Sequence, residues 1–199
     1  MDRRLTSARL GLFLCSMLLS SGLQAAAIPA LVFASENSST GGGPFSTITL
    51  AAGDLFEVFV HPDDLWSAGP LPRWSNADGL ILDLFATGSD ESGQPEGSHI
   101  GAPFSLWTQD GFTAPLGALV GRIGDTYMLL GTSFSGAAPE TGTLDLFYWD
   151  SDTSGDNKES VLVTLIIDTS PPGVAESGTF ALLALGLLGL VPTLRRKVR

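Results

Sequence analysis

Residues 143–167 read TLDLFYWDSDTSGDNKESVLVTLII, two apolar runs that flank a polar turn. In the first run Leu144, Leu146 and Tyr148 alternate with Asp145, which is the two-residue period of a β-strand. The second run is almost continuous Val, Leu and Ile, as expected of a strand that is buried on both faces or that closes a sandwich. The stretch therefore predicts a pair of β-strands around an acidic turn.

The rest of the central region repeats this pattern of short β-rich segments bounded by Gly, Pro and Asp. With the runs 143–149 and 161–167, the expected strands are 47–50, 56–60, 80–85, 104–107, 118–123 and 127–130. None of these segments shows the period of a helix. The pattern predicts an all-β domain over 46–168, built as an antiparallel β-sandwich or jelly roll.

The central region is strongly acidic. Of the 21 acidic residues all but Asp2 lie within 28–179, which contains only three cations, Arg73, Arg122 and Lys158, so its net charge is near −17. Nucleic acid and anionic lipid are poor partners for such a surface, whereas a divalent cation or a neutral sugar is compatible with it. Four Trp and eleven Phe favour a folded domain over the disorder that acidic, Gly-rich chains otherwise adopt.

The first 27 residues have the pattern of a secretory signal peptide. Arginines precede an apolar segment, 10–23, and Ala25-Ala26-Ala27 supplies the small residues that a signal peptidase requires. Cys15, the only cysteine, lies inside this segment, so the exported chain would have no disulfide and no thiol chemistry. We expect residues 28–45 to be a leader or linker.

The C-terminal region, 180–199, combines an apolar run of 15 residues, 180–194, with a terminal basic cluster. This length is at the lower limit for a membrane-spanning helix, and the cations that follow it would remain on the cytoplasmic side. A polar stalk, 169–179, precedes the run and ends in the motif VAESGT, residues 174–179.

The motif, the apolar run and the basic end together resemble the PEP-CTERM sorting signal of Gram-negative bacteria, which an exosortase processes. Alanine and serine stand where that motif has its two prolines. The resemblance implies an exported protein of biofilm- or exopolysaccharide-forming bacteria. Such a protein is held in the inner membrane by its C-terminal helix and reaches the cell surface or the medium after processing.

The turn between the last two expected strands, residues 150–159, concentrates oxygen-bearing side chains. Asp150, Asp152 and Asp156 match the first half of an EF-hand loop, but Val161 stands at the twelfth position and the flanking segments are strands. Calcium accepts six to eight oxygen ligands at about 2.3–2.6 Å. The turn thus predicts a calcium site on a β-loop, and a solvated acidic turn is the alternative.

Residues 46–167 resemble the calcium-dependent galactose-binding lectin domain of the PA-IL type. The shared motifs follow one another in the same order: Ala52-Gly53-Asp54, Trp66 to Pro70 with Trp74, Gly117 to Gly124, and Tyr148 to Asn157. The resemblance implies a β-sandwich that binds a galactoside-type glycan through calcium.

The resemblance also implies a set of ligands. The lectins hold calcium by side chains equivalent to Asp150, Asp156 and Asn157. Backbone carbonyls at positions equivalent to Thr153 or Ser154 and to Ala68 complete the shell, and two sugar hydroxyls fill the remaining places. Asp152 is a further candidate ligand in the same loop.

No residue pattern indicates an enzyme. The chain has no G-x-S-x-G elbow, and Asp90, Glu91 and Glu96 lie in a polar loop without the apolar shell that raises the pKa of a catalytic carboxyl group. We therefore expect a non-catalytic, calcium-dependent carbohydrate-binding protein associated with exopolysaccharide. A cell-surface matrix protein whose calcium site is purely structural is the alternative.

Overall fold

The computed structural model describes residues 26–152 and 154–167 of the 199-residue chain. The expected stalk and C-terminal helix lie outside these residues, and so does the expected signal peptide except for Ala26 and Ala27. Within the described residues, no helix is long and apolar enough to cross a membrane.

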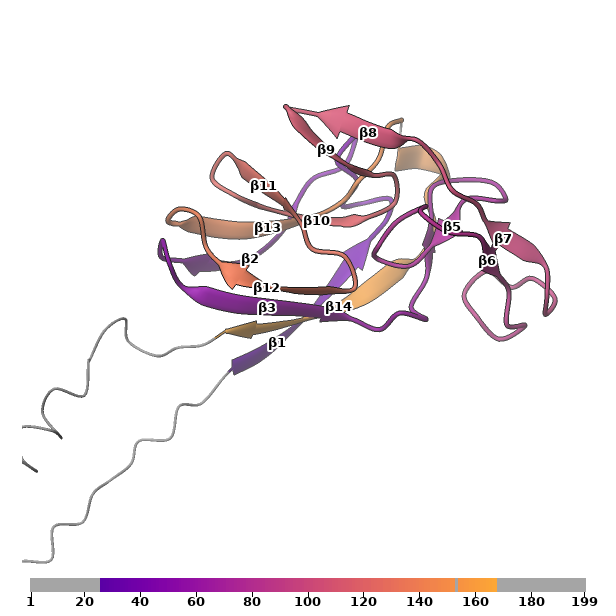
Figure 1. The fold of residues 1–199 in the computed structure, drawn as a ribbon, viewed down its shortest axis with the longest axis horizontal. Helices are drawn as coiled ribbons and strands as arrows, with labels where there is room; N and C mark the ends of the chain where they lie inside the picture. The colour runs from indigo at the N-terminus through magenta and orange to yellow at the C-terminus, as the bar shows by residue number, and fades with distance from the viewer. Residues whose placement is uncertain (1–25, 153, 168–199) are drawn as a thin grey trace, which may run out of the picture.

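The domain is an antiparallel β-sandwich, as predicted (Figure 1). Its first layer, sheet A, has the strand order β1 (Ala26–Phe33), β14 (Ser160–Ile167), β3 (Leu55–Val60) and β12 (Ser133–Ala137). Its second layer, sheet B, has the order β11 (Thr126–Leu129), β10 (Leu119–Ile123), β13 (Gly142–Tyr148) and β2 (Phe45–Leu50). The core lies between the two sheets and contains buried side chains of both, among them Val58 and Val163 of sheet A and Leu119 and Leu146 of sheet B.

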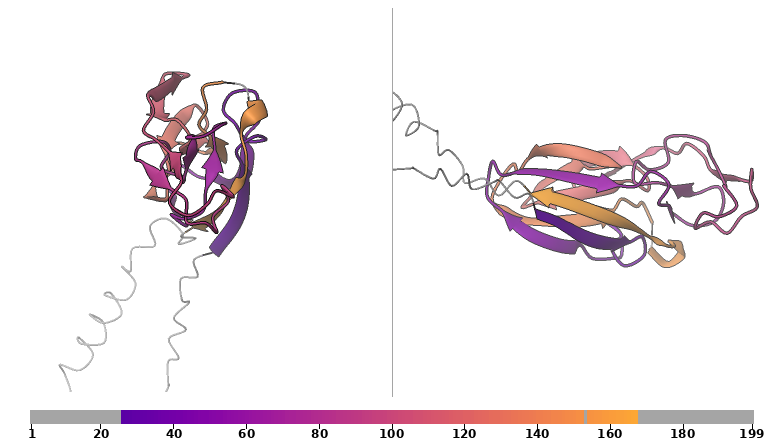
Figure 2. Two further views of the ribbon diagram at one scale, coloured as in Figure 1. Left: turned by 90° about the vertical axis from the view of Figure 1, so that its right-hand side faces the viewer. Right: turned by 90° about the horizontal axis from the view of Figure 1, so that it is seen from below.

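Three two-stranded pieces complete the fold. They are β4 (Trp66–Ser67) with β5 (Trp74–Ser75), β6 (Leu84–Phe85) with β7 (His99–Gly101), and β8 (Leu106–Gln109) with β9 (Phe112–Pro115). The first two belong to the long connection from β3 to β8, and β6 and β7 lie at one end of the domain (Figures 1 and 2). The β8–β9 hairpin covers sheet B from outside, because Trp107 and Phe112 pack there against Trp149.

The alternation expected in 143–149 is confirmed. Leu144, Leu146 and Tyr148 are fully buried in the core, while Asp145 faces the other way and binds Arg122 of β10 at 2.9 Å. Of the two alternatives for 161–167, the structure shows a strand of one sandwich layer and not a strand buried on both faces. Its residues alternate between buried and open positions, and Leu162 is 52% exposed, because nothing in the described chain covers the outer face of sheet A.

Other segments also differ from expectation: β9 and β12 are strands that were not expected, and β8 begins two residues later than the expected 104–107. Residues 28–45, expected as a leader, contain most of β1, which pairs with β14 over eight residues from Ala26↔Ile167 to Phe33↔Ser160. Strand 80–85 shrinks to Leu84–Phe85, because the preceding turn at Gly79 (φ +83°) directs the backbone of Leu80 to Leu116 instead of to a neighbouring strand.

Every strand of the sandwich pairs with another strand inside 26–167, and the core is formed by side chains of the same segment. The segment is therefore a self-contained folding unit.

Candidate functional site

The candidate site is the connection between β13 and β14. Asp150 lies two residues after Tyr148, the last residue of β13, and a single 3₁₀ turn, Ser154–Asp156, leads to Asn157. Asp150 is 3% exposed and Asn157 is 7% exposed, so the structure buries two polar side chains that the sequence places in a hydrophilic turn. Asn157 Nδ2 donates to Asp150 Oδ2 at 2.7 Å and to the carbonyl of Ala34 at 3.1 Å.

The buried carboxylate of Asp150 has only neutral donors around it. Besides Asn157, Ser38 Oγ lies 3.2 Å from its Oδ2, and the backbone N–H of Ser151 donates to its Oδ1 at 2.7 Å. No Lys, Arg or His forms an ion pair with it among the described residues. Burying a carboxylate without a partner of opposite charge is costly, so the position favours a cation.

Asn157 adds a second buried oxygen, and this one lacks a binding partner among the described residues. Its Oδ1 is buried and has no hydrogen-bond donor within the described part of the chain, while its Nδ2 is fully used. A buried amide oxygen without a donor costs about 1–3 kcal/mol unless something else binds it. A hard cation is one group that binds an amide oxygen and a carboxylate together.

Asp156 comes from the same turn and lies against the β4–β5 hairpin. Lys158 and Ser67 exchange both backbone hydrogen bonds, at 3.0 and 3.1 Å, and this fixes the two loops to each other. Gly69 has φ +115°, and a Cβ atom at this position would be 2.5 Å from Asp156 Oδ2. Only glycine allows the carboxylate to come so close to the hairpin backbone.

Ala68 is next to this contact and is 7% exposed, with its N–H donating to the carbonyl of Arg73 at 3.0 Å. Asp152 is exposed. Thr153 lies outside the described residues. Thus the structure shows two contacts, Asp150 with Asn157 and Asp156 with the backbone of Gly69, and the Ser67–Lys158 pair connects the loops that carry them.

Carboxylates alone do not make this a metal centre. Within 26–152 and 154–167, no three His, Cys, Asp or Glu side chains gather in a way that could hold a metal ion. The candidate set instead mixes two carboxylates with an amide and backbone oxygens. That mixture fits calcium, which takes carboxylate, amide and carbonyl oxygens in a flexible shell, better than it fits zinc.

The negative charges also act on the core beneath them. Tyr148 is fully buried, and burial raises the pKa of its hydroxyl well above the usual value of 10.0, with the charges of Asp150 and Asp156 raising it further. Its ring packs edge-on against Trp66, with centroids 4.6 Å apart. The hydroxyl thus stays protonated beside the carboxylates.

The loop after β1 also borders the site, and the sequence did not predict this. Ser39 Oγ donates to the carbonyl of Asp150 at 3.1 Å and accepts from its N–H at 2.9 Å, and Thr40 Oγ1 donates to the same carbonyl at 2.9 Å. The polar run 37–43 was its only sequence signal, and that run is equally typical of a linker.

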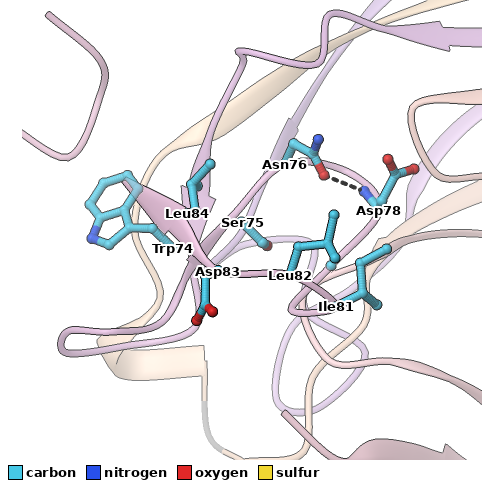
Figure 3. Close-up of a pocket in the computed structure, with 9 residues that line it drawn as sticks. Trp74, Ser75, Asn76, Asp78, Ile81, Leu82, Asp83 and Leu84 are labelled. Carbon is cyan, nitrogen blue, oxygen red and sulfur yellow. Dashed lines mark hydrogen bonds between the residues drawn. The ribbon is translucent and has the colours of Figure 1, made fainter. Parts of the chain in front are cut away.

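A second hollow, at β5 and the turn that follows it, is a weaker candidate. It has a volume of about 120 Å³ and lies between Trp74, Asn76 and Leu84 (Figure 3). The side-chain amide of Asn76, which lines the hollow, is already hydrogen-bonded. Its Oδ1 accepts from the N–H of Asp78 at 2.9 Å, and its Nδ2 donates to the carbonyl of Pro62 at 3.2 Å. The hollow is also small beside the roughly 300–1,000 Å³ of typical ligand pockets.

The comparisons with known proteins give a similarity to a solved structure. No family model and no curated protein matches the chain. A solved structure described as the EclA N-terminal domain, a PllA-like lectin, aligns over 70% of this chain and 94% of its own, with 20% sequence identity and a TM-score of 0.44. A similarity at this level says nothing about ligand residues.

Proposed function

We propose that this domain is a non-catalytic, calcium-dependent carbohydrate-binding module. Its ligand would be an exopolysaccharide or another galactoside-type glycan. The proposal depends mainly on one observation, the buried pair Asp150 and Asn157, which has a carboxylate without a cation and an amide oxygen without a donor.

The roles of the residues follow from their places in the site. Asp150, Asp156 and Asn157 would bind calcium through side-chain oxygens, and Ala68 and Thr153 through backbone carbonyls. Asp152, on the exposed side of the loop, would be an additional ligand. When bound, the ion supplies coordination positions for two vicinal sugar hydroxyls, and the loops hold it at the surface of the domain.

The location belongs to the same proposal. Residues 1–27 would direct export through signal peptidase, and 180–199 would hold the chain in the inner membrane until an exosortase-type enzyme releases it. The domain would then work at the cell surface or in the medium, where calcium is abundant and a site of moderate affinity is filled.

A purely structural calcium site is the second candidate. Asp150 and Asn157 connect the loop after β1 to both strands of the last hairpin through Ala34, Ser38 and Ser39. An ion at this junction would connect two segments that are far apart in the chain, the loop after β1 and the last hairpin, without any sugar. This is the function expected of a matrix protein.

Calorimetric titration distinguishes the two candidates. Calcium is titrated into the segment 26–167, and methyl galactoside and a glycan array are then tested with and without calcium. Heat from calcium followed by calcium-dependent glycan binding supports the lectin function, whereas calcium binding without any glycan signal supports the structural one. A segment that binds no calcium would contradict both.

A variant pair locates the ion. Asp150→Ala should remove the calcium-dependent rise in melting temperature, which corresponds to about 2.7 kcal/mol when calcium is at 100 times its Kd. Asp125→Ala removes an exposed carboxylate of the β10–β11 turn and should keep the full rise. Equal calcium responses in the two variants would place the ion elsewhere.

A further inference from the structure

The outer face of sheet A is apolar and open. Five large side chains on it are between 37% and 57% exposed: Leu31, Phe33, Leu55, Phe59 and Leu162. We call the outward residues of β1, β14, β3 and β12 the apolar face. They alternate with the core residues of the same strands, such as Val32, Val58 and Val163.

The register of the strands joins these side chains into one surface. Leu31 is paired with Leu162, and Phe59 is paired with Thr164 on the same side of the sheet. Leu55, the first residue of β3, is paired with Ala137 of β12. Leu162 comes from the nearly continuous Val/Leu/Ile run of β14, a composition typical of a strand that is covered on both sides.

The charge of the domain makes this face unusual. Residues 26–167 contain 18 carboxylates and three cations, a net charge of −15. Glu57 is the only charged residue among the outward positions of the four strands. Like-charge repulsion therefore opposes contact between two copies over most of the surface and is weakest here.

The chemistry of the face also restricts its partner. It has no cations to attract an anionic surface, and Glu57 is its only carboxylate, while Asp63, Asp64 and Glu91 border it at one edge beside Phe59 and Leu162. A surface without charge matches best a second apolar surface of the same size, and the same face on another copy meets this condition by symmetry.

The size of the face agrees with this. Five half-exposed large side chains contribute roughly 100 Å² each, so the patch reaches about 500 Å², within the range of functional patches on monomers. With the smaller outward residues around them, each copy approaches the roughly 800 Å² per partner of a standard interface.

We propose that the apolar face binds the same face of a second copy and forms a two-fold symmetric dimer. The dimer would have two of the candidate sites described above. If the proposed carbohydrate function holds, this divalency raises the avidity for a repeating polysaccharide without any new contact to the sugar. The dimer itself does not depend on that function.

Sedimentation velocity of the segment 26–167 over a range of concentrations tests the proposal. The expected result is a reversible monomer–dimer equilibrium that shifts toward dimer when NaCl is raised from about 50 to 500 mM, because salt screens the repulsion between acidic copies. A segment that stays monomeric at all concentrations and salt levels would overturn the proposal.

A matched pair of double variants locates the interface. L31Q/L162Q should weaken dimerisation at least about tenfold, because each copy loses two leucines that the dimer interface would bury. L82Q/L106Q makes the same chemical change at side chains that are 72% and 62% exposed outside sheet A, and should leave the equilibrium unchanged. The melting temperature of each variant verifies the fold.

The other outcomes count against the proposal. Equal weakening in both double variants would show nonspecific association of exposed leucines. A monomer that binds neutral phosphatidylcholine vesicles through Leu31 and Leu162 would identify the face as a lipid contact instead.

Discussion

At the scale of single residues, the candidate site is defined by polar atoms that folding leaves without partners. Asn157 Oδ1 and Tyr148 Oη are both buried and lack hydrogen-bond partners among the described residues. They differ in accessibility to an ion, because Asn157 belongs to the surface turn whereas Tyr148 points into the core below it. Asn157 is thus a ligand candidate, and Tyr148 is a cost to stability.

Tyr148→Phe tests this distinction. The substitution removes a buried hydroxyl without a partner and keeps the ring packed on Trp66, so the free energy of unfolding should rise by about 1 kcal/mol. Urea denaturation followed by tryptophan fluorescence measures the change. A loss of stability would mean that the hydroxyl has a partner in solution, such as a buried water molecule.

At the scale of elements, the site depends on the contact between the β4–β5 hairpin and the turn before β14. Gly69→Ala would place a methyl group within 2.5 Å of Asp156 Oδ2 and at a positive φ angle. We expect Asp156 to be displaced and the calcium-dependent rise in melting temperature to fall. The melting temperature is measured with calcium and with EDTA.

Gly53→Ala is the control for this variant. Gly53 also has a positive φ, +90°, but nothing lies within 4 Å of the added Cβ. Both variants should lose about 1–2 kcal/mol from backbone strain, and only Gly69→Ala should lose the response to calcium. An equal calcium response in both variants would remove Asp156 from the site.

At the scale of the whole molecule, β1 and β14 relate the site to the ends of the domain. Ala26 pairs with Ile167 at one end of sheet A, and Phe33 pairs with Ser160 at the other end, next to the site loops. Eight strand residues correspond to about 25 Å. A C-terminal anchor, as proposed above, would therefore hold the site away from the membrane.

Truncation tests whether β1 belongs to the domain. A segment that begins at Ala34 loses the buried residues Ala30 and Val32 and uncovers one edge of β14, so it should show no cooperative unfolding in urea. A segment that begins at Ile28 loses only exposed alanines and should unfold within about 1 kcal/mol of the parent. Cooperative unfolding of the Ala34 segment at the parent's midpoint would make 26–33 a dispensable leader.

The sequence predicts a strand of the sandwich well where the alternation of apolar and polar residues within that strand shows which of its faces is buried. The alternation of Leu144, Leu146 and Tyr148 identifies the face of β13 that enters the core, and hairpin turns separate the other predicted strands. Short strands such as β4 (Trp66–Ser67) and β5 (Trp74–Ser75) escape prediction because two residues have no period. β1 was missed because Ala and Pro dilute its pattern.

The site was predicted in part for a similar reason. Asp150, Asp156 and Asn157 stand in one turn, so composition alone brings them together. Ser38, 112 positions before Asp150, reaches the carboxylate because the loop after β1 pairs through its backbone with Tyr148 at the end of β13. No local pattern reports such a contact.

The sequence by itself determined the class of the fold, the acidity of the domain and the turn in which oxygen-bearing side chains gather, because strand periodicity, charge and loop composition are local properties. The tertiary structure decided that Asp150 and Asn157 are buried, that Gly69 receives Asp156, and that the outer face of β14 stays open. These are properties of packing, since burial depends on which distant strand, loop or second molecule covers a residue.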